Sequence, residues 1–253
     1  MKKSGTIVCL LAIAAPFGVD AQTEGPMPMK PEMTEIWEPE VRVVTPGETP
    51  INPPSDAIVL FNGDNLIDEW TDSKGGKPGW KIEDGFFTVV KGTGTIKTKR
   101  VFQDFQLHLE WRSPEEISGT SQGRGNSGVF LQERYEIQIL DSYNNRTYRN
   151  GQAASIYKQH APLVNATKEP GKWQTYDIIY TAPRFNDDDT YFTPPRVTVL
   201  HNGVLVQNNA VLRGPTEYIG IPEYSIKKHG PGSIILQDHG NPVSFRNIWI
   251  REL

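Results

Sequence analysis

The stretch QDFQLHLEWR, residues 103–112, decides the fold class. Every second residue from Phe105 to Trp111 is apolar, and the residues between them are polar. A period of two is typical of a β-strand that buries one face and exposes the other. The stretch therefore predicts a strand that packs its apolar face on a core.

Short runs of the same kind recur between residue 57 and residue 253. Gly, Asn, Asp and Pro separate them, and the pairs Asp84-Gly85 and Asn202-Gly203 are typical of hairpin turns. The predicted strands are residues 57–61, 80–83, 86–90, 103–112, 128–131, 135–140, 175–181, 196–201, 204–207, 233–237 and 243–251. This pattern predicts an all-β fold, a sandwich or jelly roll of two antiparallel sheets, in which the first and last runs pair.

The N-terminal part of the chain begins with a segment of a different kind. Residues 1–21 combine a basic start, an apolar run and a small-residue cleavage pattern, which together predict a secretory signal peptide. The only cysteine, Cys9, lies within this segment, so the mature chain would form no disulfide. We therefore expect a periplasmic or secreted protein.

Residues 22–56 are rich in proline and show no period, which predicts an extended tether or a strap lying over the domain. Trp37 and the run from Val41 to Val44 are the parts that could dock. Residues 57–253 are expected to form a single β-sandwich domain, because this length can bury a core of its own.

Composition and charge narrow the choice of partner. The net charge of −4 is mild, and the basic residues form no stripe, which argues against a nucleic-acid partner. After the predicted signal peptide, no apolar run reaches the length of about 20 residues that a membrane span needs. We expect the partner to be a small neutral or polar molecule.

Several predicted strands carry polar side chains that could bind a ligand, on the face opposite their apolar residues or at the strand ends. They are Glu110, Asn126, Glu136, Gln138, Gln237 and His239. If one sheet gathered them, carboxylates, amides and an imidazole would form a carbohydrate site with acid/base capability.

Each of these side chains also has a structural interpretation. Glu136 and Gln138 would suit a plain solvated face, Glu110 a cross-strand ion pair, and His239 a turn. The acidic run 187–189 lacks the glycine-centred spacing of a calcium loop and is interpreted as a solvated loop.

The spacing Glu136-x-Gln138 bears on the type of chemistry. Ordinary glycosidases need two carboxylates beside one glycosidic bond, and here an amide stands where the second carboxylate belongs. Glutamine can act neither as a nucleophile nor as a base. A catalytic role for this strand would therefore require something other than ordinary double displacement.

Eight ordered motifs from about Ala57 to Leu253 resemble those of the 3-keto-disaccharide hydrolase family. They are FNGDNL, DFQLHLEWR, NSGVFL, YEIQILDS, GQAASIYKQHAP, GKWQTYDI, HNGVLVQ and GSIILQDHGNPVSFRNIWIREL. The resemblance implies a concanavalin-like sandwich that acts on sugars already oxidised at C3. A base would remove the C2 proton and the enolate would expel the C1 substituent by β-elimination, with or without later hydration.

The resemblance also implies partners. The substrate would be a small oxidised sugar, and an oxidoreductase that makes the ketone would be the functional partner. The alternative is a non-catalytic carbohydrate-binding module of the same fold.

Carried over to this sequence, the resemblance implies that Glu136 and His239 form the acid/base pair. Arg124 or Arg246 would stabilise the enolate, although Arg246 suits a structural role equally well. Tyr157 and His160 would cap the pocket from the loop 151–162. The implied substrate-binding residues are Glu110, Arg124, Asn126, Gln138, Tyr157, His160, Gln237 and Arg246.

The resemblance implies no particular cofactor. A divalent metal bound by Glu and His could replace the arginine as the electrophile that stabilises the enolate.

Overall fold

The computed structural model describes residues 27–220 and 228–253. The chain divides into two units, Met1–Val43 and Val44–Leu253. The predicted signal peptide, residues 1–21, lies outside the described residues. In the first unit the described part contains one short 3-10 helix, Pro31–Met33, and the side chains of Trp37 and Val41 are exposed.

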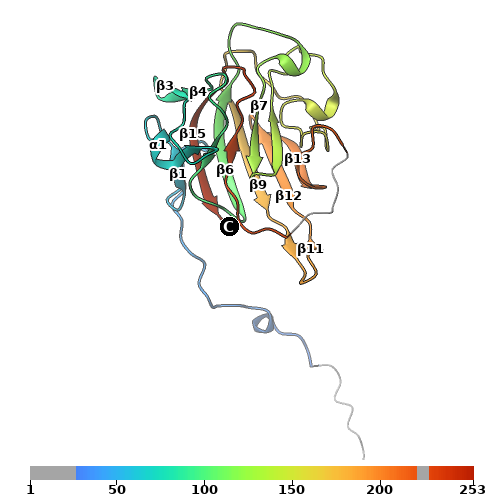
Figure 1. Ribbon diagram of the computed structural model, residues 1–253. Coiled ribbons are helices and arrows are strands. Elements are labelled where there is room, and N and C mark those ends of the chain that lie inside the picture. Colours follow the sequence, from blue (N-terminus) through green and yellow to red (C-terminus); the bar gives the residue numbers. More distant parts are fainter. Residues whose placement is uncertain (1–26, 221–227) are drawn as a thin grey trace, which may run out of the picture. The chain divides into compact units, whose positions relative to one another are not determined.

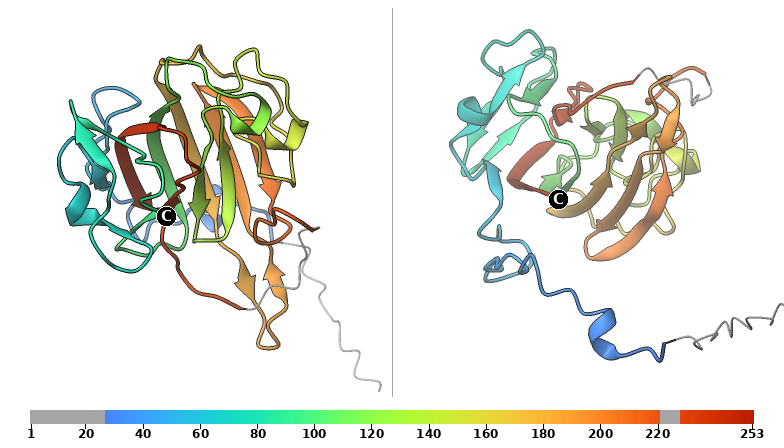
Figure 2. Two further views of the ribbon diagram at one scale, coloured as in Figure 1. Left: turned by 45° about the horizontal axis from the view of Figure 1, so that its top comes forward. Right: turned by 90° about the horizontal axis from the view of Figure 1, so that it is seen from below.

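The second unit consists mainly of two antiparallel sheets (Figures 1 and 2). The larger sheet has the strand order β13-β12-β9-β6-β15-β4-β3, and β1 also pairs with β15. Its strands are β1 (Ile58–Phe61), β3 (Lys81–Glu83), β4 (Phe86–Thr88), β6 (Phe105–Arg112), β9 (Gln174–Thr181), β12 (Arg196–His201), β13 (Val204–Val211) and β15 (Ser244–Glu252).

The smaller sheet has the order β2-β5-β14-β7-β8. Its strands are β2 (Trp70–Asp72), β5 (Ile96–Thr98), β14 (Ile235–Leu236), β7 (Ser127–Leu131) and β8 (Tyr135–Ile139). A separate hairpin pairs β10 (Arg184–Phe185) with β11 (Tyr191–Thr193), and the acidic run 187–189 lies in its turn. The short helices are α1 (Leu66–Glu69), η2 (Ser121–Gly123) and η3 (Arg149–Gly151). The prediction of an all-β sandwich of two antiparallel sheets is confirmed.

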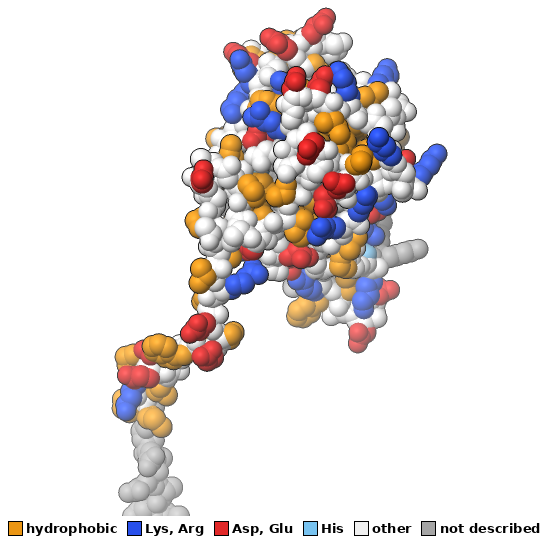
Figure 3. Space-filling model, turned by 90° about the vertical axis from the view of Figure 1, so that its left-hand side faces the viewer, with side chains coloured by type: hydrophobic (Ala, Val, Ile, Leu, Met, Phe, Trp, Pro, Cys, Tyr) orange, Lys and Arg blue, Asp and Glu red, His pale blue; other side chains and the backbone are white. Residues whose placement is uncertain are grey.

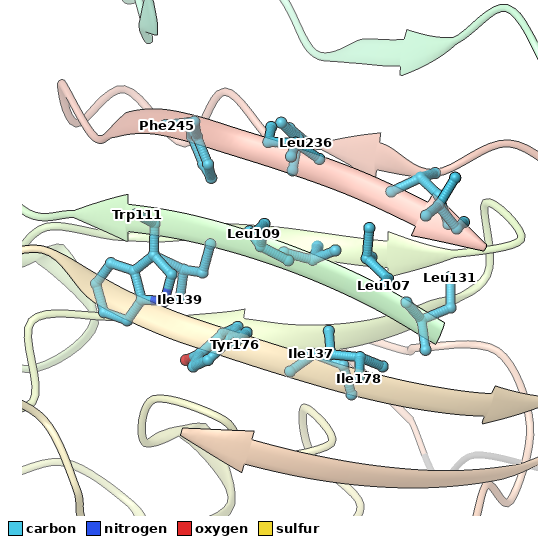
Figure 4. Close-up of a cluster of buried hydrophobic side chains, with 14 of the residues drawn as sticks. Leu107, Leu109, Trp111, Leu131, Ile137, Ile139, Tyr176, Ile178, Leu236 and Phe245 are labelled. Carbon is cyan, nitrogen blue, oxygen red and sulfur yellow. The ribbon is translucent and has the colours of Figure 1, made fainter. Parts of the chain in front are cut away.

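The core lies between the two sheets, and the alternating residues of β6 form its centre. Phe105, Leu107, Leu109 and Trp111 are all buried in one cluster with residues of the smaller sheet. Figure 4 shows the side chains of β6 and β9 gathered with Ile137 and Ile139 of β8. Burial of each large apolar side chain contributes about 1.5–3 kcal/mol, so this shared cluster holds the two layers together.

Every predicted strand appears in the structure, and the predicted pairing of the first and last runs is confirmed. Val59 of β1 lies opposite Trp249 of β15. Sequence reasoning missed β2, β5, β10 and β11. These strands have two or three residues each, too few for a period of two to become visible.

A strap of residues 44–56 packs on the outer face of the larger sheet. The carbonyl of Ile51 accepts hydrogen bonds from Asn247 Nδ2 at 2.9 Å and from Trp249 Nε1 at 3.0 Å. Arg251 also pairs with Asp56 at 2.9 Å. The compact unit therefore begins at Val44, before the predicted boundary at residue 57.

The surface shows no concentration of one charge on the side seen in Figure 3, where acidic and basic side chains are interspersed. This agrees with the mild net charge of −4. Within residues 27–220 and 228–253, no helix has the length and apolar character that crossing a bilayer requires.

Candidate active site

A pocket of about 370 Å³ lies on the outer face of the smaller sheet. In β8, Tyr135, Ile137 and Ile139 point into the core, so Glu136 and Gln138 point the opposite way. The described residues that line the pocket are Asn126, Phe130, Glu136, Gln138, Tyr157, Thr216, Tyr218, Gln237 and His239. The volume falls within the range of about 300–1,000 Å³ that is usual for small-molecule sites.

Six of the ten predicted site residues line this pocket. They are Asn126, Glu136, Gln138, Tyr157, Gln237 and His239. Sequence reasoning missed Phe130, Thr216 and Tyr218. Phe130 belongs to the alternating pattern of β7, so this pattern could have identified it as a pocket residue. Thr216 and Tyr218 lie in a segment whose apolar residues show no regular spacing, so no sequence pattern indicated them.

Glu136 is buried, with only 4% of its surface exposed. Burial raises the pKa of Glu136 to about 8, because the low-dielectric surroundings disfavour its charged form. Its carboxyl group rests against Gly128 of the neighbouring strand, in space that the Cβ of any other residue would occupy. Glu136 is therefore a carboxylic acid that holds its proton at neutral pH.

Gln138 links Glu136 to a wider hydrogen-bond network. Its Nε2 donates to Gln122 Oε1 at 2.9 Å, and Gln122 Nε2 in turn donates to Thr147 Oγ1 and to the carbonyl of Gly151. The other end of the Gln138 amide lies 3.1 Å from Glu136 Oε1. With Nε2 on Gln122 Oε1, the oxygen of Gln138 faces Glu136 Oε1 and the carbonyl oxygen of Ser127, each at 3.1 Å. A protonated Glu136 can donate to this oxygen.

The segment after β14 places Gln237 and His239 at the pocket. The backbone N–H of Gln237 donates to the carbonyl of Gly128 at 3.0 Å, which extends the pairing with β7. Asp238 fixes the turn, since its carboxylate accepts hydrogen bonds from the backbone N–H groups of Gly92, Gly94 and Gly240.

Two side chains in this segment carry polar atoms that have no hydrogen-bond partner among the described residues. The side-chain oxygen of Gln237 is buried, yet it makes no hydrogen bond within the described part of the chain. His239 is exposed and likewise has no hydrogen bond to a described residue. Since buried polar atoms are normally satisfied, the oxygen of Gln237 marks a place for a ligand donor.

Tyr157 lies at the pocket next to a cluster of aromatic rings around a lysine. Its hydroxyl is 2.7 Å from the hydroxyl of Tyr148. Burial, followed by this hydrogen bond, raises the pKa of Tyr157, so its hydroxyl remains a proton-bearing donor. Lys158 Nζ lies 4.5 Å from the ring centre of Tyr148, 5.7 Å from that of Tyr157 and 5.6 Å from that of Tyr218. Neither Lys158 nor Tyr148 was predicted from the sequence.

The prediction that Glu110 and Arg246 belong to the same site is wrong. Both lie on the outer face of the larger sheet, where Arg246 Nε is 2.7 Å from Glu110 Oε2. Asn247 Nδ2 donates to the other carboxylate oxygen of Glu110 at 2.9 Å, and Arg246 lies 4.2 Å from the ring centre of Trp173. The core separates this ion pair from Glu136, because β6 and β8 belong to different layers.

Arg124 and His160 also lie outside the pocket. Arg124 Nε is 2.6 Å from Asp141 Oδ2, and its Nη2 donates to the carbonyl of Tyr143 at 2.9 Å. It lines a second pocket beside the first. His160 Nε2 lies 2.9 Å from the carbonyl oxygen of Val211, a contact that fixes the loop. Neither residue lines the pocket of Glu136 and His239, so the predicted capping by His160 is wrong, whereas substrate binding by Arg124 stays a prediction.

The acidic and histidine residues of the pocket do not fit a zinc site. Glu136 and His239 line the pocket, but within the described ranges no third His, Cys, Asp or Glu joins them in a metal-binding group. Two such ligands are fewer than structural or catalytic zinc sites use.

Comparisons with known proteins agree with the sequence motifs. The profile of the 3-keto-alpha-glucoside-1,2-lyase-like domain matches residues 56–251. A crystal structure from Parabacteroides distasonis, named as a proposed glycosyl hydrolase, is 55% identical, with a TM-score of 0.84 over 90% of this chain and 99% of that chain.

Two more structures from that organism bear the same description and share the fold. They are 22% and 23% identical, with TM-scores of 0.56 and 0.54 over 78% of this chain and 94% and 99% of theirs. No curated protein matches the sequence.

Proposed function

Because this chain belongs to the 3-keto-alpha-glucoside-1,2-lyase-like family, we propose that it cleaves 3-keto-glycosides by β-elimination in the pocket of Glu136 and His239. One observation carries the proposal. A carboxylic acid with a pKa of about 8 shares a small pocket with an imidazole that no described residue engages. This pair supplies a proton donor and a proton acceptor near neutral pH.

In the first step, His239 accepts the proton from C2 of the substrate. The ketone at C3 makes this proton acidic, and the C–H electron pair moves into an enolate whose charge lies on the C3 oxygen. The hydroxyl of Tyr157 is the donor available to that oxygen, and the nearby Lys158 cation adds a favourable field. In this proposal Tyr157 and Lys158 stabilise the enolate, the role that the family resemblance implied for Arg124 or Arg246.

In the second step, the enolate restores the C3 carbonyl and forms a double bond between C1 and C2. The bond from C1 to the glycosidic oxygen breaks, and that oxygen takes the proton from Glu136. His239 then releases its extra proton to solvent, and Glu136 takes up a proton from solvent, which restores both groups to their starting states. Addition of water across the new double bond would yield a 3-keto sugar and complete a hydrolysis.

The remaining polar side chains hold the sugar hydroxyls. Asn126 Nδ2 donates to the carbonyl of Gln122 at 2.6 Å, which leaves its side-chain oxygen as an acceptor. The unsatisfied oxygen of Gln237 is a second acceptor. Gln138 completes the floor beside Glu136. A conventional glycosidase is disfavoured, because this pocket offers no second carboxylate among its described lining residues.

The experiment is an assay of the purified protein with a 3-keto-glucoside and with the unoxidised parent glucoside. Release of the aglycone from the keto sugar alone, with an enone or its hydrate as co-product in mass spectra, is expected. Cleavage of the parent would contradict the proposal. Binding of both sugars without cleavage would instead identify a carbohydrate-binding module, which the unpaired oxygen of Gln237 would also suit.

The proposed substrate requires a source. An oxidoreductase must convert the C3 hydroxyl to a ketone before this reaction begins. With the predicted signal peptide at residues 1–21, we propose that the protein is exported and works beside that oxidoreductase outside the cytoplasm.

A further inference from the structure

Two neighbouring side-chain amides, Gln138 and Gln122, connect Glu136 to the loop at Gly151. Gln138 Nε2 lies 2.9 Å from Gln122 Oε1, and Gln122 Nε2 lies 2.9 Å from both Thr147 Oγ1 and the carbonyl oxygen of Gly151. A half-turn about the last side-chain torsion exchanges the oxygen and the nitrogen of an amide with little other movement. This amide pair, Gln122 and Gln138, therefore has two hydrogen-bonded orientations.

In the first orientation, Gln138 donates to Gln122, and Gln122 donates to the carbonyl of Gly151. The oxygen of Gln138 then lies 3.1 Å from Glu136 Oε1 and 3.1 Å from the carbonyl oxygen of Ser127. A protonated Glu136 can donate to this oxygen, but the carbonyl of Ser127 cannot. One contact between two acceptors remains.

In the second orientation, both amides are turned. Gln138 Nε2 then donates to Glu136 Oε1 and to the carbonyl of Ser127, each at 3.1 Å. The oxygen of Gln138 faces Gln122 at 2.9 Å and accepts from it, because Gln122 now presents its nitrogen there. The oxygen of Gln122 meets the carbonyl oxygen of Gly151, which is again one contact between two acceptors.

The protonation state of Glu136 decides between these two orientations. Each orientation leaves one pair of acceptors in contact, and the hydroxyl of Thr147 can donate or accept, so it suits both. A protonated Glu136 is a donor and favours the oxygen of Gln138. An ionised Glu136 repels that oxygen and favours the nitrogen, since a hydrogen bond to a charged acceptor is roughly twice as strong as a neutral one.

Other titratable and charged groups around Glu136 do not take this role. They are Tyr157, Tyr218 and His239 on the pocket lining and Lys158 behind Tyr157. None of the four forms a hydrogen bond with the carboxyl group of Glu136 in the described part of the chain, and the raised pKa of Glu136 has burial as its cause. Gln138 is placed to respond to the charge, because its amide lies 3.1 Å from the carboxyl oxygen.

We propose that the amide pair is a two-state relay: Gln138 accepts from Glu136 while the acid is protonated, and both amides turn when the proton leaves. Gln122 is a positioning residue, because it acts on Glu136 only through Gln138. The benefit for catalysis rests on the proposed function. As the proton of Glu136 passes to the glycosidic oxygen, the carboxylate that forms gains a hydrogen-bond donor. Proton uptake from solvent turns the pair back.

Neutron diffraction from crystals of the perdeuterated wild-type protein tests the relay directly, because deuterium distinguishes the two ends of an amide. Data are collected without substrate at about pH 6 and about pH 10, on either side of the pKa of about 8 of Glu136. At the lower pH the deuterons of Gln138 should point to Gln122. At the higher pH they should point to Glu136 and Ser127. The same orientation at both pH values would overturn the proposal.

Gln122→Met tests the positioning role in solution. The variant keeps the length of the side chain and removes the oxygen that meets the carbonyl of Gly151 in the second orientation. Gln138 can then donate to the carboxylate without that unfavourable contact, so Glu136 should lose its proton about one pH unit lower. Carbon-13 NMR of labelled glutamate carboxyl groups measures this titration, and the alkaline limb of kcat should move by the same amount.

Gln106→Met is the matched control, because Gln106 belongs to β6 in the larger sheet. It should leave both the titration and the alkaline limb unchanged. A folded Gln122→Met protein in which Glu136 titrates as in the wild type would contradict the relay. A fall in kcat with an unmoved alkaline limb would likewise assign Gln122 a purely structural role.

These measurements separate the relay from the proposed reaction. Neither the diffraction experiment nor the NMR titration requires turnover. A wild-type protein whose amide pair turns with pH but which cleaves no 3-keto-glucoside would refute the proposed reaction and support the relay. An active enzyme with a fixed amide pair would refute the relay alone.

Discussion

The carboxyl group of Glu136 occupies the space that a side chain at Gly128 would fill. Glu136 lies on β8 and Gly128 on the paired strand β7. Because Gly128 has no Cβ, the carboxyl group of Glu136 can lie against β7. Replacing Gly128 by Ala should therefore push Glu136 out of position. We expect turnover of a 3-keto-glucoside to fall about a hundredfold in kcat, because misplacement by about 1 Å has this effect.

Gly230→Ala is the control for that variant, since Gly230 is exposed and nothing lies within 4 Å of an added Cβ. Circular dichroism and thermal unfolding would establish that both variants are folded. Normal activity in a folded Gly128→Ala protein would show that the position of Glu136 does not matter for catalysis.

Glu136→Gln should reduce turnover by about 10²–10⁴-fold, because an amide cannot donate the proton that the leaving oxygen needs. In the wild-type protein kcat should fall as the pH rises through about 8, where Glu136 loses its proton. A pH–rate profile measures this alkaline limb. A wild-type profile that stays flat up to pH 10 would exclude Glu136 as the proton donor.

The raised pKa of Glu136 also predicts how stability depends on pH. The group titrates near 4.5 when unfolded and near 8 when folded, so the folded state binds more protons between these values. Stability contributed by this group is present below about pH 4.5 and is lost as the pH rises to about 8, by up to a few kcal/mol.

Glu136→Gln should therefore be more stable than the wild-type protein at pH 8 and similar to it near pH 4.5. Urea unfolding at both pH values measures the difference. An equal free-energy difference between the two proteins at both pH values would mean that the folded carboxyl titrates normally.

His239→Gln should lower turnover by about 10²–10⁴-fold without changing the free energy of unfolding. The side chain is exposed and makes no hydrogen bond to any residue within 27–220 or 228–253, so its removal disturbs no packing. His160→Gln is the matched histidine control, because His160 contacts the carbonyl of Val211 outside the pocket. A comparable activity loss in both variants would remove His239 from its proposed role.

Glu110→Ala should affect stability and leave kcat unchanged in the folded protein. The carboxylate is buried, and its removal leaves Arg246 without its carboxylate partner and Asn247 Nδ2 with the carbonyl of Ile51 alone, at a cost of about 1–3 kcal/mol. Glu83→Ala, which breaks the exposed pair with Lys81, should cost less than about 1 kcal/mol. Urea unfolding compares the two. A selective loss of kcat in Glu110→Ala would reinstate Glu110 near the site.

The sequence predicted the strands far better than it predicted their assignment to layers. Glu110 and Glu136 stand in equivalent alternating patterns, and both were correctly expected to lie opposite apolar residues. A period of two identifies the face that turns away from the core, but it carries no information on which sheet a strand joins. That choice depends on long-range pairing, and β6 joined the larger sheet while β8 joined the smaller one.

Loop residues were harder to predict for a related reason. Arg124 and His160 were expected at the pocket because of their side-chain chemistry. In the structure each contacts a residue outside the pocket instead. Asp141 and the carbonyl of Val211 approach them only in the folded chain. Lys158 and Tyr148 escaped notice because the cluster that joins them depends on the path of a long loop.

The place of β15 in the larger sheet has a consequence for biosynthesis. This strand is flanked by β6 on one side and by β1 and β4 on the other, and it is translated after all of them. Until the ribosome has delivered residues 244–252, the earlier strands cannot close around their common neighbour. The larger sheet should thus be completed only when synthesis of the domain is nearly finished.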